Sequence, residues 1–96
     1  MITVQRITPA QYAEAAARVV EWARHDSTSA LLARDFLEAL VVRETPVDLG
    51  ALLGRADMKN RAAILHVLDG WGAWGPCHTL DVWRVQWWQK HEETGC

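Results

Sequence analysis

The side chains best suited to chemistry lie in the last quarter of the chain. Two cysteines and two histidines there offer metal-binding or nucleophilic groups: Cys77, His78, His91 and Cys96. Structural zinc sites usually draw ligands from paired spacings such as Cys-x2-Cys, which place two donors on one turn. Cys77 and His78 are adjacent, so their side chains point in different directions. We therefore expect no metal site, and no structural disulfide because a cytosolic compartment keeps thiols reduced.

No sequence pattern typical of an enzyme accompanies these groups. Cys77 beside His78 is not a catalytic dyad, because neighbouring residues at a helix start rarely face each other. The chain has no Gly-x-Ser-x-Gly elbow, no phosphate-binding glycine loop followed by lysine, and no Cys-x-x-Cys. The run GWGAWG at 70–75 favours a backbone turn, since its tryptophans would obstruct a phosphate. We expect no catalytic residue, no cofactor and no enzyme activity.

A weak helix-turn-helix pattern occurs between residues 48 and 68, with Gly54 at the turn. Arg55 and Asn60 occupy positions that must be apolar for the two helices of such a unit to pack. Arg55, Lys59 and Arg61 are the residues that would contact phosphate in this alternative, a small DNA-binding regulator. Two packed helices without DNA binding is the favoured interpretation.

Composition sets broad limits on the protein. The 96 residues are half hydrophobic and carry ten basic against twelve acidic side chains, a formal charge of −2. This length predicts one domain, and this charge makes nucleic acid a poor candidate partner. No apolar run is long enough to cross a membrane and no signal peptide begins the sequence, so we expect a location in the cytoplasm of the cell that makes it, without membrane association.

Five helices are predicted, two of them short. The sequence indicates an extended arm over residues 1–7, a helical bundle over 8–92 and a flexible tail over 93–96. Thr8, Ser27 with its neighbours, Asp48 and Asp57 are expected to cap four helix starts. The expected helices run from Pro9 to about His25, from about Ser29 to before Pro46, from Leu49 to Gly54, from Asp57 to a stop at Gly70, and from Thr79 to about Glu92. The predicted fold is a single compact all-α bundle.

Tryptophan is concentrated near the end of this bundle. Five of the six tryptophans lie between Trp71 and Trp88. Helical spacing places Trp83 and Trp87 on the same face as Leu80, which predicts that they are core residues, with Val85 and Trp88 flanking that face. Indole rings are large and are enriched at binding hot spots. We predict that the tryptophans outside the core bind another protein: Trp71, Trp74, Trp88 and, off the main stripe of its helix, Trp22.

From His25 to Trp88 the chain resembles a family of short uncharacterised helical proteins from phages and other mobile elements of proteobacteria. The likeness rests first on the cap at 26–28, the segment ARDFL at 33–37 and the segment VDL at 47–49. It continues with Asp57, the segment 64–68 and His78. It ends with Trp83 and one of the two tryptophans at 87–88. The resemblance implies an all-helical domain of phage or plasmid origin. It supplies no catalytic residues.

These features lead to one functional hypothesis and two alternatives. The leading hypothesis is a non-enzymatic phage protein that binds a host protein or protein complex, as inhibitors of bacterial defence systems do, anti-CRISPR proteins among them. The alternatives are the DNA-binding regulator described above and a structural subunit that forms a homodimer through its tryptophans.

Overall fold

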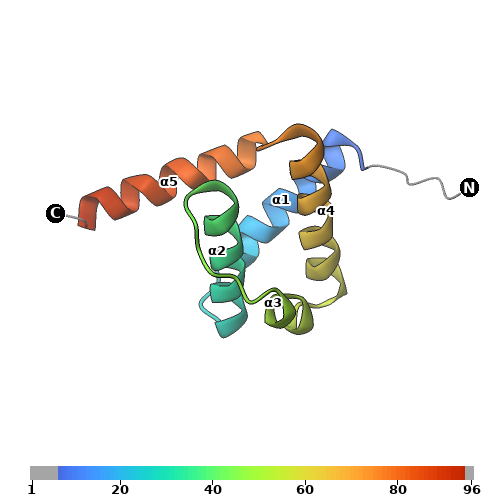
Figure 1. Cartoon of the computed structure of the whole chain (residues 1–96), viewed down its shortest axis with the longest axis horizontal. Coiled ribbons are helices and arrows are strands. Elements are labelled where there is room, and N and C mark those ends of the chain that lie inside the picture. The colour runs from blue at the N-terminus through green and yellow to red at the C-terminus, as the bar shows by residue number, and fades with distance from the viewer. Residues whose placement is uncertain (1–6, 95–96) are drawn as a thin grey trace, which may run out of the picture.

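The computed structural model describes residues 7–94 and shows five α-helices joined by short loops (Figure 1). The helices are α1 (Pro9–Ala23), α2 (Thr28–Val41), α3 (Leu49–Arg55), α4 (Met58–Trp74) and α5 (His78–Thr94). No strand occurs within these residues. The prediction of an all-α bundle is confirmed, and the predicted arm lies outside the described residues except for Ile7.

The first four helices begin at the predicted caps. The side chain of Thr8 accepts a hydrogen bond from the Gln11 amide at 3.1 Å, and the Gln11 side chain accepts one from the Thr8 amide at 2.9 Å, which completes a capping box. Ser27, Asp48 and Asp57 each accept from the backbone amide three residues later, at 3.2, 3.0 and 2.7 Å. Each such cap contributes about 1 kcal/mol, so local chemistry defines where these helices start.

Helix α1 is the central element of the bundle. It packs against α2, α4 and α5, while α3 packs against α2 (Figure 1). The core is built from side chains of all five helices, and its largest fully buried members are Leu37, Leu52, Ile64, Leu80, Val19 and Val67. No polar or charged residue among those described is buried. Because α1 is covered from several directions, its apolar surface is wider than a single stripe.

The predicted stop at Gly70 is wrong, because α4 continues through this glycine to Trp74. Gly70 is buried where α4 crosses α1, and a Cβ atom at this position would lie 2.2 Å from Cγ of Tyr12. The helix ends instead at Gly75, whose φ of 73° belongs to the left-handed region that favours glycine. Gly70 therefore allows close helix packing, and Gly75 makes the turn.

The last helix begins at His78 and continues to Thr94, two residues past its predicted end, while residues 95–96 of the expected tail lie outside the described part. Its first half packs on α1 and α2, and its second half reaches away from the other four helices (Figure 1). Leu80 is fully buried, and Trp83 packs against the core. The helix thus leaves the bundle after anchoring itself with its first two turns.

None of the described helices is long and apolar enough to cross a membrane.

Candidate protein-binding surface

Trp22 lies in the core rather than on the surface. Its side chain is 8% exposed, and its indole N–H donates to the Ser29 hydroxyl at 3.4 Å. The expectation that Trp22 is an exposed binding residue is wrong, because α2 folds back over the end of α1 and covers the side that a one-stripe helix would leave open. Only part of the ring remains visible, beside a shallow groove that Arg18 and His25 also line.

Trp71 and Trp74 lie near the end of α4 but differ in burial. Trp71 is half-buried and packs against the core, so it is only partly available to a partner. Trp74 is 46% exposed, and its ring stacks on Tyr12 with centroids 6.1 Å apart and an interplanar angle of 25°. Of these two predicted binding residues, Trp74 is the one that presents a large indole surface to solvent.

Tyr12 connects α1 to the loop between α4 and α5. Its hydroxyl donates a hydrogen bond to the Gly75 carbonyl at 2.8 Å. Burial raises the pKa of Tyr12 to about 12, and the nearby Cys77 thiol adds to this effect. The phenol is therefore neutral at physiological pH and acts as a structural donor, with no sign of a nucleophilic or acid–base role.

The side of α5 that faces away from the core carries three exposed apolar residues, Val82, Val85 and Trp88, here called the outer strip. They are 38%, 47% and 43% exposed. Their spacing of three residues places them along one side of the helix, with Val82 and Val85 far round from the buried Leu80 and Trp88 nearer to it. The Trp88 ring lies edge-on to the Trp87 ring, with centroids 5.0 Å apart. Trp88 is exposed as predicted, whereas Val85 lies further from the core face than its predicted flanking position.

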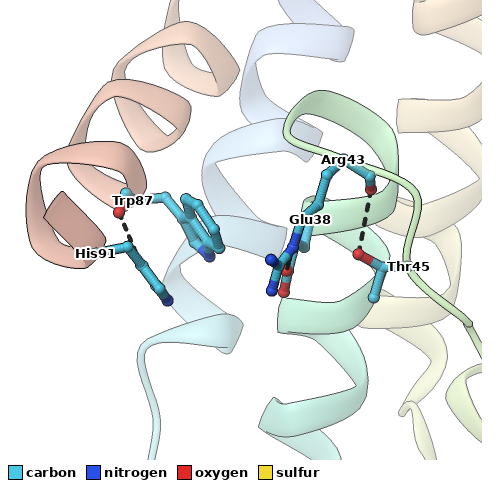
Figure 2. Close-up of polar contacts among 5 residues, drawn as sticks. All are labelled: Glu38, Arg43, Thr45, Trp87 and His91. Carbon is cyan, nitrogen blue, oxygen red and sulfur yellow. Dashed lines mark hydrogen bonds and ion pairs between the residues drawn. The ribbon is translucent and has the colours of Figure 1, made fainter. Parts of the chain in front are cut away.

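Trp87 is half-buried and lies outside the core cluster, so its prediction as a core residue is wrong. The indole stacks on the His91 ring with centroids 3.6 Å apart, and the Arg43 guanidinium carbon lies 5.1 Å from the indole centroid (Figure 2). Arg43 in turn pairs with Glu38 at 2.7 Å. Because α5 has already left the bundle at this point, Trp87 packs between polar groups of α5 and the end of α2.

A groove of about 670 Å³ separates the second half of α5 from α2 and the end of α1. Its apolar lining includes Leu31, Trp83 and Trp87. Its charged lining is balanced, with three acidic and three basic side chains: Asp26, Asp35, Glu38, Arg24, Arg34 and Lys90. No sequence pattern predicts this groove, because it depends on the angle at which α5 leaves the bundle.

The basic residues of the DNA-binding alternative do not form a helix-turn-helix surface. Arg61 donates to the Leu53 carbonyl at 3.3 Å, and Asn60 accepts from Arg18 at 3.0 Å, which joins α4 to α1. Helix α3 packs on α2 and α4 packs on α1, whereas in a helix-turn-helix the two helices pack on each other. Arg55 and Lys59 are exposed at this junction. The arrangement gives the DNA-binding alternative no support.

Cys77 is a free, half-buried thiol that packs against the core. Among the described residues, no group of three or more histidine, cysteine or acidic side chains is placed to hold a metal ion. Cys96, the other cysteine considered for such a site, lies outside the described residues.

No family model, curated protein or solved structure matches this chain. The resemblance to phage proteins therefore stays a prediction, and the function has to be argued from the surface of the molecule.

Proposed function

We propose that this protein acts without catalysis, by binding another protein in the groove between α2 and α5. The observation that supports this most directly is the groove lining, in which the half-buried Trp83 and Trp87 lie beside the exposed Leu31. Tryptophan in a concave, partly desolvated setting is the residue type most enriched among binding hot spots. A partner side chain entering this groove would meet both apolar and charged side chains.

The mixed charges of the groove favour a specific partner of a different sequence. Asp35 and Glu38 come from α2, whereas Arg24 follows the end of α1 and Lys90 comes from α5. Such an arrangement attracts a surface with the complementary order of charges and repels others, so it contributes more to selectivity than to raw affinity. Trp74, exposed at the far end of α4, is a separate candidate contact for the same partner.

The partner class follows from the family resemblance. We propose a host protein or protein complex of a bacterial defence system, so that occupation of its surface by this small phage-type protein blocks its activity. An anti-CRISPR function is the specific form of this proposal.

Two leucines provide a matched test of the groove. Leu31 lines the groove and Leu65 lies on α4 outside it, and both are 52% exposed. Leu31→Glu should weaken the affinity for a purified host partner by at least about tenfold, because it places an unpaired charge in the interface. Leu65→Glu should leave the affinity unchanged. The partner is first captured from bacterial lysate by the immobilised chain, identified, and then measured by titration.

A defence assay tests the partner class. Expression of the wild-type chain in a bacterium with an active CRISPR system should restore phage plaques, and Leu65→Glu should do the same. Leu31→Glu should not. If Leu31→Glu and Leu65→Glu bind the captured partner with equal affinity, the groove proposal is wrong. If the chain binds its partner but the CRISPR defence stays fully active, only the anti-CRISPR form of the proposal is wrong.

A further inference from the structure

The three basic side chains that line the groove already have partners. Arg34 donates two hydrogen bonds to backbone carbonyls around the end of α1, at 2.6 and 2.5 Å. Arg24 pairs with Glu21 at 3.6 Å. Lys90 also interacts within the chain. None of the three is therefore left over to pair with an anion from another molecule.

Two of the three acidic side chains in the groove have no partner. Glu38 pairs with Arg43 at 2.7 Å. Asp35 is half-buried on α2, and Asp26 is exposed just before that helix. Neither aspartate makes a hydrogen bond or an ion pair with another residue in the described part of the chain. The equal numbers of acidic and basic residues thus leave two carboxylates unpaired, and the group that pairs with them is a cation.

One guanidinium of the chain itself is already held at the edge of the groove. Arg43 pairs with Glu38 of α2, and its guanidinium carbon lies 5.1 Å from the centroid of the Trp87 indole of α5 (Figure 2). A cation within about 6 Å of an indole face is attracted by the ring, and a carboxylate adds a charge-assisted hydrogen bond. A carboxylate from α2 and an indole from α5 therefore bind one arginine between them.

The same two residue types recur one turn earlier on both helices. Asp35 precedes Glu38 by three positions in α2, and Trp83 precedes Trp87 by four in α5, so each lies on the same side of its helix as its counterpart. Asp35 and Trp83 both line the groove. Trp87 already contacts a histidine ring and a guanidinium, whereas no ring or cation among residues 7–94 lies against the half-buried Trp83. The second carboxylate and indole thus lack the cation that the first pair holds.

We propose that the partner inserts an arginine side chain into the groove, where its guanidinium pairs with Asp35 and lies against the Trp83 indole. Arginine fits these two groups better than lysine, because its planar guanidinium stacks on aromatic faces and forms two parallel hydrogen bonds to a carboxylate. Asp26 attracts a further basic residue of the same partner segment. This inference rests on the proposed function, since it names the group that the partner protein offers to the groove.

The first test uses N-acetyl-arginine amide as the probe and follows the tryptophan indole N–H signals of the wild-type chain by nuclear magnetic resonance. The Trp83 signal should shift as the probe is added, and the shift should weaken in high salt, which screens the charges. N-acetyl-citrulline amide has the same shape without the charge, so its affinity should be at least about threefold lower. An unshifted Trp83 signal, or equal affinity for the two probes, would overturn the proposal.

The second test changes the carboxylate. Asp35→Asn should bind the arginine probe at least about threefold more weakly than the wild type, because it removes the charge and keeps the size of the side chain. Glu14→Gln makes the same kind of change at an exposed position of α1 outside the groove and should bind the probe like the wild type. If the two variants bind the probe equally well, Asp35 does not pair with the guanidinium and the proposal is wrong.

Measurements with the captured host partner separate this inference from the proposed function. Asp35→Asn should weaken the affinity for that partner, and Glu14→Gln should not. A partner that is lost with Leu31→Glu but binds Asp35→Asn as tightly as Glu14→Gln refutes the arginine contact and keeps the groove. An arginine probe that binds at Trp83, with a partner unaffected by Leu31→Glu, keeps the arginine site and refutes the proposed function of the groove.

Discussion

Gly70 and Gly72 are two residues apart in α4 but have different surroundings. A Cβ atom at Gly70 would overlap the Tyr12 ring, whereas a Cβ atom at Gly72 would meet nothing within 4 Å. We expect Gly70→Ala to lower the free energy of unfolding by about 1–3 kcal/mol through overpacking of the α1–α4 contact. Gly72→Ala should raise it by about 0.4–1 kcal/mol, because alanine reduces the entropy of the unfolded chain at an open helical position.

Urea denaturation followed by circular dichroism measures both glycine variants against the wild type. The same stability for Gly70→Ala and Gly72→Ala would show that α1 and α4 do not approach each other as closely as the structure has them.

Tyr12 is the single tyrosine of the chain, so its ionisation can be observed directly. Its pKa is about 12 in the folded protein, raised first by burial, against an ordinary value of 10.0. The protonated phenol is thus favoured by folding, and the stability that it contributes is fully present below pH 10 and is lost as the pH rises towards 12. The near-ultraviolet absorbance of tyrosinate should appear near pH 12 in the native protein and near pH 10 in urea.

Tyr12→Phe provides the control for this pH dependence. The difference in unfolding free energy between the wild type and Tyr12→Phe should change between pH 10 and 12 and stay constant below that range. A native-state titration near pH 10 would show that the phenol is in water and that its hydrogen bond to Gly75 is absent.

At the scale of elements, Arg34 of α2 closes the C-terminal end of α1. Its guanidinium donates to the carbonyls of Ala23 and His25 at 2.6 and 2.5 Å. These carbonyls have no partner within α1's own hydrogen-bond pattern, and a cation at this end also complements the helix dipole. We expect Arg34→Met to destabilise the protein by about 1–3 kcal/mol, because the methionine keeps the apolar stem but removes the donors.

Arg24→Met is the matched control for Arg34→Met. Arg24 is exposed and pairs with Glu21, three residues earlier, at 3.6 Å. Thermal denaturation should show that Arg24→Met lowers the free energy of unfolding by only about 0.2–1 kcal/mol. Equal losses for the two variants would mean that Arg34 contributes no more than a surface ion pair.

Helix starts could be predicted from sequence because each depends on a cap residue and its near neighbours. Thr8, Ser27, Asp48 and Asp57 all cap as expected. The end of α4 could not be predicted from sequence. A glycine that permits a turn cannot be distinguished from a glycine that permits close packing until the residue that faces it is known. For Gly70 that residue is Tyr12, 58 positions earlier in the numbering.

The burial of the tryptophans was predicted less well than the fold, for a related reason. Trp74 and Trp88 are exposed as expected, but Trp22 is buried by a second helix and Trp87 lies outside the core because α5 leaves the bundle. Helical periodicity describes one face of one helix. It contains no information on how many neighbours a helix has or where along its length they end, so neither the groove nor the contact between Trp87 and Arg43 had a sequence signal.

At the scale of the whole molecule, the second half of α5 is dispensable for the core. The described core extends no further than Leu80, and the last residue packed against it is Trp83. A chain that stops after Gln86 should still unfold cooperatively. Its free energy of unfolding should be lower by about 1–2 kcal/mol, because the contacts of Trp87 with Arg43 and His91 are removed. Circular dichroism during thermal unfolding measures this, and a truncated chain without a cooperative transition would contradict the assignment of the core.

The central position of α1 has a consequence for synthesis of the chain in the cell. Tyr12 meets its carbonyl partner 63 positions later, and the Ile7 amide meets Asp69 62 positions later. The first helix therefore leaves the ribosome before α4 and α5, and the part of its apolar surface that these two helices cover stays open to chaperones until they follow. A slow stretch of codons before the last two helices would prolong this exposed period.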